Sequence, residues 1–238
     1  GLDYRVELPK LQQPVLVLCP DDDLRTATLR ARPLIRNGRF VELRGFAHGF
    51  LDVHTDAAVA QLRDFLDAPA AQSGAAPVAK PAPPPPPRAE HRVRRAYFKG
   101  PYGALHYRIA TPARPAAPPI FMFHMSPSSG RTFMPMLHEL GRDRVAVAPD
   151  TPGFGDSEAP PEPIGIEDYA ASMAALIDSL GFAQVDVMGY HTGAMTCVAL
   201  ALLPPLLVRR IVQISSPVFT DAELAGFRAH YAAKPLRE

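Results

Sequence analysis

Short apolar runs alternate with segments of helical periodicity along most of the 238-residue chain. The apolar runs predict mostly buried strands at 14–19, 39–43, 96–98, 104–109, 120–123, 145–148, 184–188 and 210–214. The periodic segments predict helices at 25–35, 55–67, 132–140, 166–180 and 192–203. Strands that alternate with helices form parallel βαβ units, so we predict an α/β fold with a mostly parallel sheet and helices on both faces.

Local signals set the ends of several of these elements. Thr55 is expected to cap the helix that starts there. Gly181 is expected to end the helix that starts near Ile166, because glycine readily adopts the left-handed conformation that follows many helices. Asn37 and Gly38 predict the turn into the second strand.

An Ala- and Pro-rich segment, residues 69–90, interrupts this pattern and includes five consecutive prolines at 83–87. Such a segment cannot form a core, and proline favours extended backbone. We therefore expect a disordered linker. It separates a short piece, residues 1–68, from a long piece, residues 91–238.

Composition and charge narrow the range of functions. Apolar residues make up 47% of the chain, and the net charge of +1 argues against a nucleic-acid partner. Cys19 and Cys197 lie in apolar stretches without metal-site spacing, so we expect core residues rather than a disulfide framework. No stretch resembles a signal peptide or is apolar over the length of a membrane span, so we expect a cytoplasmic protein that does not bind membranes.

Three loops with glycine follow predicted strands. Residues 150–157 have the sequence Asp-Thr-Pro-Gly-Phe-Gly-Asp-Ser, residues 189–193 have Gly-Tyr-His-Thr-Gly, and residues 45–48 have Gly-Phe-Ala-His. In open parallel sheets, ligands bind at the carboxyl ends of the strands. These loops lie at such ends and are therefore the first candidates for a site.

On these motifs the chain resembles the α/β-hydrolase family. Residues 150–157 match the family's D-x-x-G-x-G-x-S loop, a turn at His124 follows an earlier strand, and residues 189–193 match the strand–turn–helix nucleophile elbow. The resemblance implies that the long piece is the N-terminal half of such a domain. It also implies that the short piece, which contains Asp23 and His48, is the C-terminal half.

The two halves stand in the reverse of the family's order, in which the nucleophile precedes the acid and the histidine. The chain is therefore either a circular permutant that closes into one domain or a segment spanning the junction of two tandem domains. The 22-residue linker allows both readings, because it extends to roughly 68 Å and crossing an eight-stranded sheet needs about 34 Å. In the permuted reading, the strand at 211–214 lies beside the strand at 15–19.

The elbow carries His191 where the family has its nucleophilic serine. The sharp turn needs small residues two positions before and after that side chain, and glycine stands at both. The resemblance implies an oxyanion site formed by the N–H groups of Met125 and Thr192.

The resemblance also implies that His48 acts as the base and that Asp23 orients it. Asp21 and Asp22 remain alternatives to Asp23, since loops can shift by one or two residues. The family's cap is expected to be largely missing, because only the two ends of the chain resemble parts of it. The substrate-binding surface is therefore not readable from the sequence.

Two functions follow from this reading. The first is a cofactor-free enzyme that acts on a small ester or a similar carbonyl substrate, with His191 as an unusual nucleophile. The second is a catalytically silent relative that binds a small apolar ligand or a protein partner. A metal site formed by His191, His48 and Asp23 is disfavoured, because in the family arrangement the acid lies behind its histidine.

Overall fold

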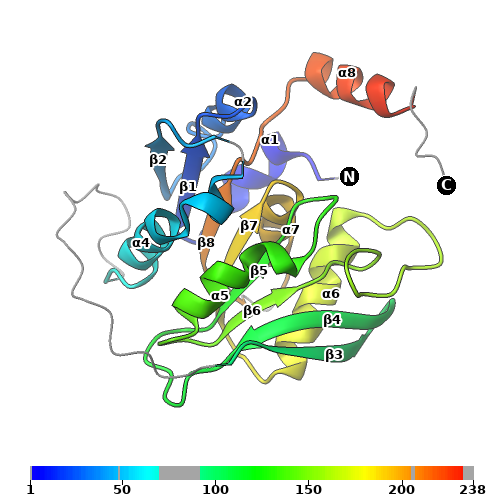
Figure 1. The fold of residues 1–238 in the computed structure, drawn as a ribbon. Helices are drawn as coiled ribbons and strands as arrows, with labels where there is room; N and C mark the ends of the chain where they lie inside the picture. Colours follow the sequence, from blue (N-terminus) through cyan, green and yellow to red (C-terminus); the bar gives the residue numbers. More distant parts are fainter. Residues whose placement is uncertain (1, 48, 70–91, 205–206, 233–238) are drawn as a thin grey trace.

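The computed structural model describes residues 2–47, 49–69, 92–204 and 207–232. Within these ranges one eight-stranded sheet has the order β2-β1-β8-β7-β5-β6-β4-β3 (Figure 1). The strands are β1 (Val15–Pro20), β2 (Gly38–Leu43), β3 (Arg94–Gly100), β4 (Gly103–Ala110), β5 (Ile120–Phe123), β6 (Ala146–Pro149), β7 (Val185–Tyr190) and β8 (Val208–Ile214). Only the pairs β3–β4 and β4–β6 are antiparallel, which confirms the predicted mostly parallel sheet.

Helices cover both faces of the sheet. The helices are α1 (Tyr4–Glu7), α2 (Arg25–Leu29), α3 (Phe50–Val53), α4 (Thr55–Leu66), α5 (Met134–Leu140), α6 (Ile166–Ser179), α7 (Thr192–Ala201) and α8 (Asp221–Ala232), with short 3-10 turns η1 (Leu8–Lys10) and η3 (Gly130–Phe133). α6 and α7 pack over one face, and α4 and α5 over the other.

The apolar strands are buried from both sides. Val15 and Val17 of β1 belong to the core beneath α6 and α7, whereas Leu16 and Leu18 belong to the core beneath α4 and α5. Successive strand residues point to opposite faces, so only a continuous apolar run can fill both cores.

The short and long pieces share this one sheet. β1 pairs in parallel with β8, with Val15 opposite Ile211 and Leu18 opposite Ile214. Beside this pairing, the Gln13 side-chain amide donates to the carbonyl of Ala201 at 3.1 Å. The two strands of the short piece, β1 and β2, thus extend the sheet of the long piece at β8.

Several predicted element ends are confirmed and others are wrong. Gly181 has φ 77° just after α6, as expected. The helix predicted over 25–35 ends as α2 at Leu29, and Pro33, which disfavours helical backbone in the residue before it, lies just beyond. Thr55 does not cap α4, because its hydroxyl instead donates to the carbonyl of Leu51 at 2.7 Å.

Two further predictions concern the linker and membrane-spanning helices. The predicted linker at 69–90 lies outside the described residues, apart from residue 69. None of the described helices combines the length and the apolarity needed to cross a lipid bilayer.

Candidate active site

The elbow at His191 has the backbone geometry of a sharp strand-to-helix turn. His191 has φ 50° and ψ −112°, a conformation that side-chain-bearing residues rarely adopt. Its N–H donates to the carbonyl of Ile214 in β8 at 3.1 Å, and its own carbonyl accepts the N–H of Ala194 at 2.9 Å, which starts α7. His191 therefore lies between the end of β7 and the start of α7 and turns the chain at the carboxyl edge of the sheet.

Close backbone approach explains both glycines of the elbow. A Cβ atom at Gly189 would overlap the carbonyl group of Gly193. A Cβ at Gly193 would in turn overlap the carbonyl oxygen of Phe123, at the end of β5. Such overlaps cannot be relieved without moving backbone, so the sharp turn requires glycine at both positions.

Asp21 and Asp22, two of the candidate aspartates at the end of β1, are hydrogen-bonded to neighbouring loops. The Asp21 carboxylate accepts the N–H of Gly45 at 2.7 Å. The Asp22 carboxylate accepts the hydroxyl of Ser215 at 2.6 Å and the N–H of Leu24 at 3.0 Å. Both carboxylates therefore fasten neighbouring loops at this edge of the sheet.

Asp23, the predicted orienting acid, follows β1 at the same edge. In the sheet, β1 is separated from β7 by β8 alone, so Asp23 and His191 follow strands that are two positions apart. His48, the predicted base, lies outside the described residues. Its neighbour Gly49 is described, and the N–H of Gly49 donates to the hydroxyl of Tyr190 at 3.3 Å.

The loop after β5, which contains the predicted oxyanion donor Met125, is held by His124. The N–H of Thr151 donates to Nε2 of His124 at 2.9 Å, so Nδ1 carries the proton and donates to the Met125 carbonyl at 2.7 Å. Burial lowers the pKa of His124 and favours this neutral form. The second predicted donor, Thr192, is the first residue of α7, where the N–H has no carbonyl partner within the helix.

Asp150 also anchors the loop after β5, through a hydrogen bond at the start of η3. Its buried carboxylate accepts the N–H groups of Gly130 and Asp156, at 2.7 and 2.9 Å, and also contacts Arg108 and His106 at 3.0 and 2.9 Å. Although burial raises the pKa of Asp150, these donors outweigh it and lower the pKa below its ordinary value. The group is therefore an ionised anchor for the turn that begins η3.

His106, Asp150 and Asp156 place three potential metal ligands within 4.8 Å of one another. Arginines already supply positive charge to this group. Arg95 donates to His106 at 3.0 Å and pairs with Asp156 at 2.6 Å, while Arg108 pairs with Asp150. These contacts fit an ion-pair network better than a cation site.

Sequence reasoning did not identify Tyr190, Ser215 or this network. For the network a signal was present, because His106 and Arg108 are polar residues two positions apart in an otherwise apolar strand. Residues at that spacing share one face of a strand, and both reach Asp150.

Comparisons with known proteins agree with this architecture. Residues 118–233 match the model of the alpha/beta hydrolase fold family. A 2-hydroxy-6-oxo-2,4-heptadienoate hydrolase from Pseudomonas putida is 39% identical over 83 residues, which cover 34% of this chain and 29% of the relative. A 2-hydroxymuconate semialdehyde hydrolase from Pseudomonas sp. strain CF600 is 34% identical over 124 residues, or 49% of this chain and 43% of the relative.

A solved structure, the epoxide hydrolase of Vigna radiata, is 26% identical with a TM-score of 0.51 and covers 58% of this chain and 46% of that one. The family match, the relatives and the sheet confirm the predicted resemblance of this chain to the α/β-hydrolase fold family. Its curated relatives include enzymes named as hydrolases. The chain spans less than half the length of these relatives.

Proposed function

We propose that this protein hydrolyses a small ester or a similar carbonyl substrate at the elbow, with His191 as the nucleophile. The observation that carries the proposal is the elbow itself. Its positive φ at residue 191 and its two obligatory glycines hold one side chain at the carboxyl edge of the sheet. The relatives named as hydrolases support the reaction class.

The chemistry that fits this position is acyl transfer through imidazole. A ring nitrogen of neutral His191 attacks the carbonyl carbon, and the carbonyl oxygen becomes an oxyanion that the N–H groups of Met125 and Thr192 stabilise. Collapse of this intermediate expels the alkoxide, which takes the proton released by the other ring nitrogen of His191, and leaves a neutral acyl-imidazole. Water then attacks the acyl group, releases the acid and regenerates His191.

In the proposed site His48 is the base that accepts the proton of the attacking water, and Asp23 orients His48. Two observations support this assignment. Gly49, next to His48 in the chain, is hydrogen-bonded to Tyr190, the residue before His191. Asp23 follows β1, which only β8 separates in the sheet from β7, the strand that leads into the elbow.

We further propose that the chain closes into one domain with its halves in permuted order. The parallel pairing of β1 with β8 supports this reading, because it joins the short piece to the long piece in one sheet. The family match lies wholly within the long piece, as expected if a continuous alignment can follow only one half of a permuted chain.

The alternative is a catalytically silent relative that binds a small apolar ligand or a protein partner. The absence of a hydroxyl at position 191 favours it, because imidazole is slow against unactivated esters. Hydrolysis of p-nitrophenyl acetate by wild type, His191→Ser and His191→Ala separates the two functions. Turnover by wild type that is lost in His191→Ala supports the enzyme, whereas turnover by His191→Ser alone identifies a silent relative.

A third variant controls for background reactivity. His138 is an exposed histidine on α5, and His138→Ala should leave ester turnover unchanged. Equal loss of turnover in His138→Ala and His191→Ala would mean that surface imidazoles react with the ester, and the proposed site would then be rejected.

A further inference from the structure

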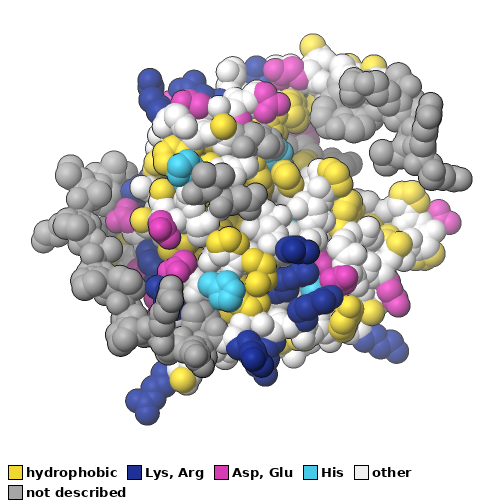
Figure 2. All heavy atoms as spheres, in the orientation of Figure 1, with side chains coloured by type: hydrophobic (Ala, Val, Ile, Leu, Met, Phe, Trp, Pro, Cys, Tyr) yellow, Lys and Arg dark blue, Asp and Glu magenta, His cyan; other side chains and the backbone are white. Residues whose placement is uncertain are grey.

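A hollow lies on the face of the sheet that carries α5. We call it the arginine pocket, and it has a volume of about 500 Å³. Its lining residues come from the start of β3, from β4 and from the η3–α5 segment, and they are Val93, Arg95, Arg108, Arg131 and Met134. Figure 2 shows Lys and Arg side chains gathered on this face beside acidic side chains and a histidine.

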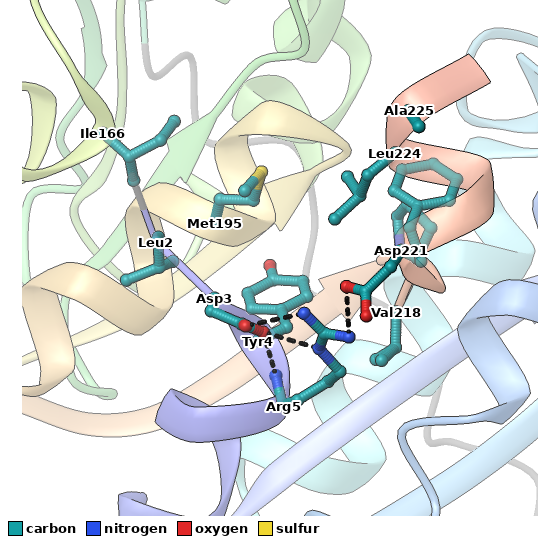
Figure 3. A pocket seen from close by; sticks show the side chains of 12 residues that line it. Leu2, Asp3, Tyr4, Arg5, Ile166, Met195, Val218, Asp221, Leu224 and Ala225 are labelled. Carbon is teal, nitrogen blue, oxygen red and sulfur yellow. Dashed lines mark hydrogen bonds and ion pairs between the residues drawn. The ribbon is translucent and has the colours of Figure 1, made fainter. Parts of the chain in front are cut away.

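By contrast, the more apolar cavity in Figure 3, about 490 Å³, lies between the first residues of the chain and α8. Arg5 bridges Asp3 and Asp221 across its rim at 2.9 and 2.7 Å. Nothing in its lining indicates the chemistry of an occupant. The arginine pocket gives more information about a ligand, because its positive charge favours an anion.

Two of the three guanidinium groups are held in place. Arg108 is largely buried and pairs with Asp150 at 3.0 Å, and Arg95 pairs with Asp156 at 2.6 Å. His106 accepts from Arg95 and contacts Asp150, which fits a neutral ring. Two carboxylates thus offset two arginines and fix their positions at one wall of the pocket.

The third guanidinium, that of Arg131, supplies the excess charge. Arg131 is exposed and pairs with no carboxylate among the described residues. With three guanidinium groups and two carboxylates, the group has a net charge of +1. An anion in the pocket has the guanidinium group of Arg131 and those of the two paired arginines within the same lining.

We propose that the arginine pocket binds the phosphate group of a small phosphate monoester. A single guanidinium satisfies a planar carboxylate, whereas guanidinium groups from three separate elements suit a tetrahedral anion with several outward oxygens. Val93 and Met134, which also pack against the α4–α5 core, provide an apolar wall for the carbon part of the ester. The site is independent of the proposed elbow chemistry and requires no turnover.

Phenyl phosphate is the probe, titrated into the full chain by isothermal calorimetry at constant ionic strength. Wild type should bind one equivalent saturably, and inorganic phosphate should bind more weakly because it makes no contact with the apolar wall. Acetate at the same concentration should give no saturable heat. Absence of saturable binding by phenyl phosphate, or equal affinity for inorganic phosphate or acetate, would overturn the proposal.

Two variants locate the site. Arg131→Ala should weaken phenyl phosphate binding about tenfold or more, because the variant loses a charged hydrogen-bond donor to the phosphate. Arg94→Ala removes an exposed arginine whose side chain projects from the opposite face of β3 and should change the affinity less than about twofold. Equal affinities for wild type and Arg131→Ala, or equal losses in the two variants, would refute the assignment.

The folded state of the variants is checked by thermal unfolding. Arg131 is exposed, so Arg131→Ala should unfold at the wild-type temperature in the absence of phosphate. Addition of phenyl phosphate should raise the unfolding temperature of wild type and of Arg94→Ala by more than that of Arg131→Ala. A rise of the same size in all three proteins would count against the pocket.

Discussion

The hydroxyl of Tyr190, the last residue of β7, accepts the backbone N–H of Gly49 at 3.3 Å. The two residues are 141 positions apart and belong to the long and the short piece. The Tyr190 side chain is buried, and its ring meets the imidazole of His191 edge-on with a centroid distance of 4.4 Å. One side chain thus contacts both the elbow and the loop in which the predicted base stands.

Removal of this hydroxyl should loosen the loop at Gly49. We expect Tyr190→Phe to keep the ring contact with His191 and to lower the free energy of unfolding by about 0.5–1.5 kcal/mol. Amide hydrogen exchange at Gly49 should become faster. Tyr97→Phe is the control, because Tyr97 is 58% exposed; unchanged exchange at Gly49 in Tyr190→Phe would contradict the contact.

The elbow should not tolerate a methyl group at Gly193. Gly193→Ala would place Cβ against the backbone carbonyl of Phe123, and we expect a loss of more than about 3 kcal/mol of stability or failure to fold. Gly226→Ala is the matched control, because nothing lies within 4 Å of a Cβ there and alanine favours helix by up to about 1 kcal/mol. Chemical denaturation of both variants measures the difference in their free energies of unfolding. Similar values would mean that the backbone of Gly193 does not lie so close to that of Phe123.

The two aspartates near Arg108 should differ sharply in importance. Asp150→Asn removes a buried charge that anchors Gly130, Arg108 and His106, and we expect a loss of about 3–5 kcal/mol. The Asp156 side chain is 44% exposed, so Asp156→Asn should cost less than about 1 kcal/mol. Urea unfolding of the two variants measures both losses in the free energy of unfolding. A larger loss in Asp156→Asn than in Asp150→Asn would contradict the prediction.

The carboxyl group of Asp186 should make stability fall as the pH rises. Burial raises its pKa from 3.8 to about 6, and the ion pair with Arg209 only partly offsets that effect. Because the folded-state pKa is the higher one, the stabilising contribution of the protonated acid is complete below about pH 4 and is lost as the pH passes 6. The full effect is about 3 kcal/mol.

Comparison with Asp186→Asn isolates this group from the other carboxyls. The free energy of unfolding is measured between pH 4 and 7 for both proteins. The difference, wild type minus Asp186→Asn, should decrease across this window because only wild type carries the titrating acid. A constant difference would show that Asp186 titrates at its ordinary value in the folded protein.

The fold could be predicted from the sequence largely because its strands are apolar on both faces. Residues 120–123 contribute to both cores, and this requirement is visible in the sequence as a continuous apolar run. The elbow was also visible, because the close approach at Gly189 and Gly193 demands glycine. Contacts such as that of Asp22 with Ser215 join residues 193 positions apart, and no local pattern encodes them.

Cleavage within the linker should test how the two pieces pair. The contacts between them extend beyond β1 and β8: Arg144 binds Asp67 at 2.8 Å, and Arg209 donates to the carbonyl of Leu66 at 2.9 Å. We therefore expect a chain with a protease site inserted after residue 79 to remain together after cleavage. The fragments should elute at the volume of the uncut 25.8 kDa chain and separate only in denaturant.

The tandem reading makes a different prediction for the same sample. In that reading the two pieces belong to two different domains, so the cleaved pieces should separate from each other without denaturant. Mixing cleaved, isotope-labelled and unlabelled protein at low concentration distinguishes the two. Pieces that belong to one closed domain should exchange only as fast as the chain unfolds, because β1 must leave its parallel pairing with β8 before a new partner can enter.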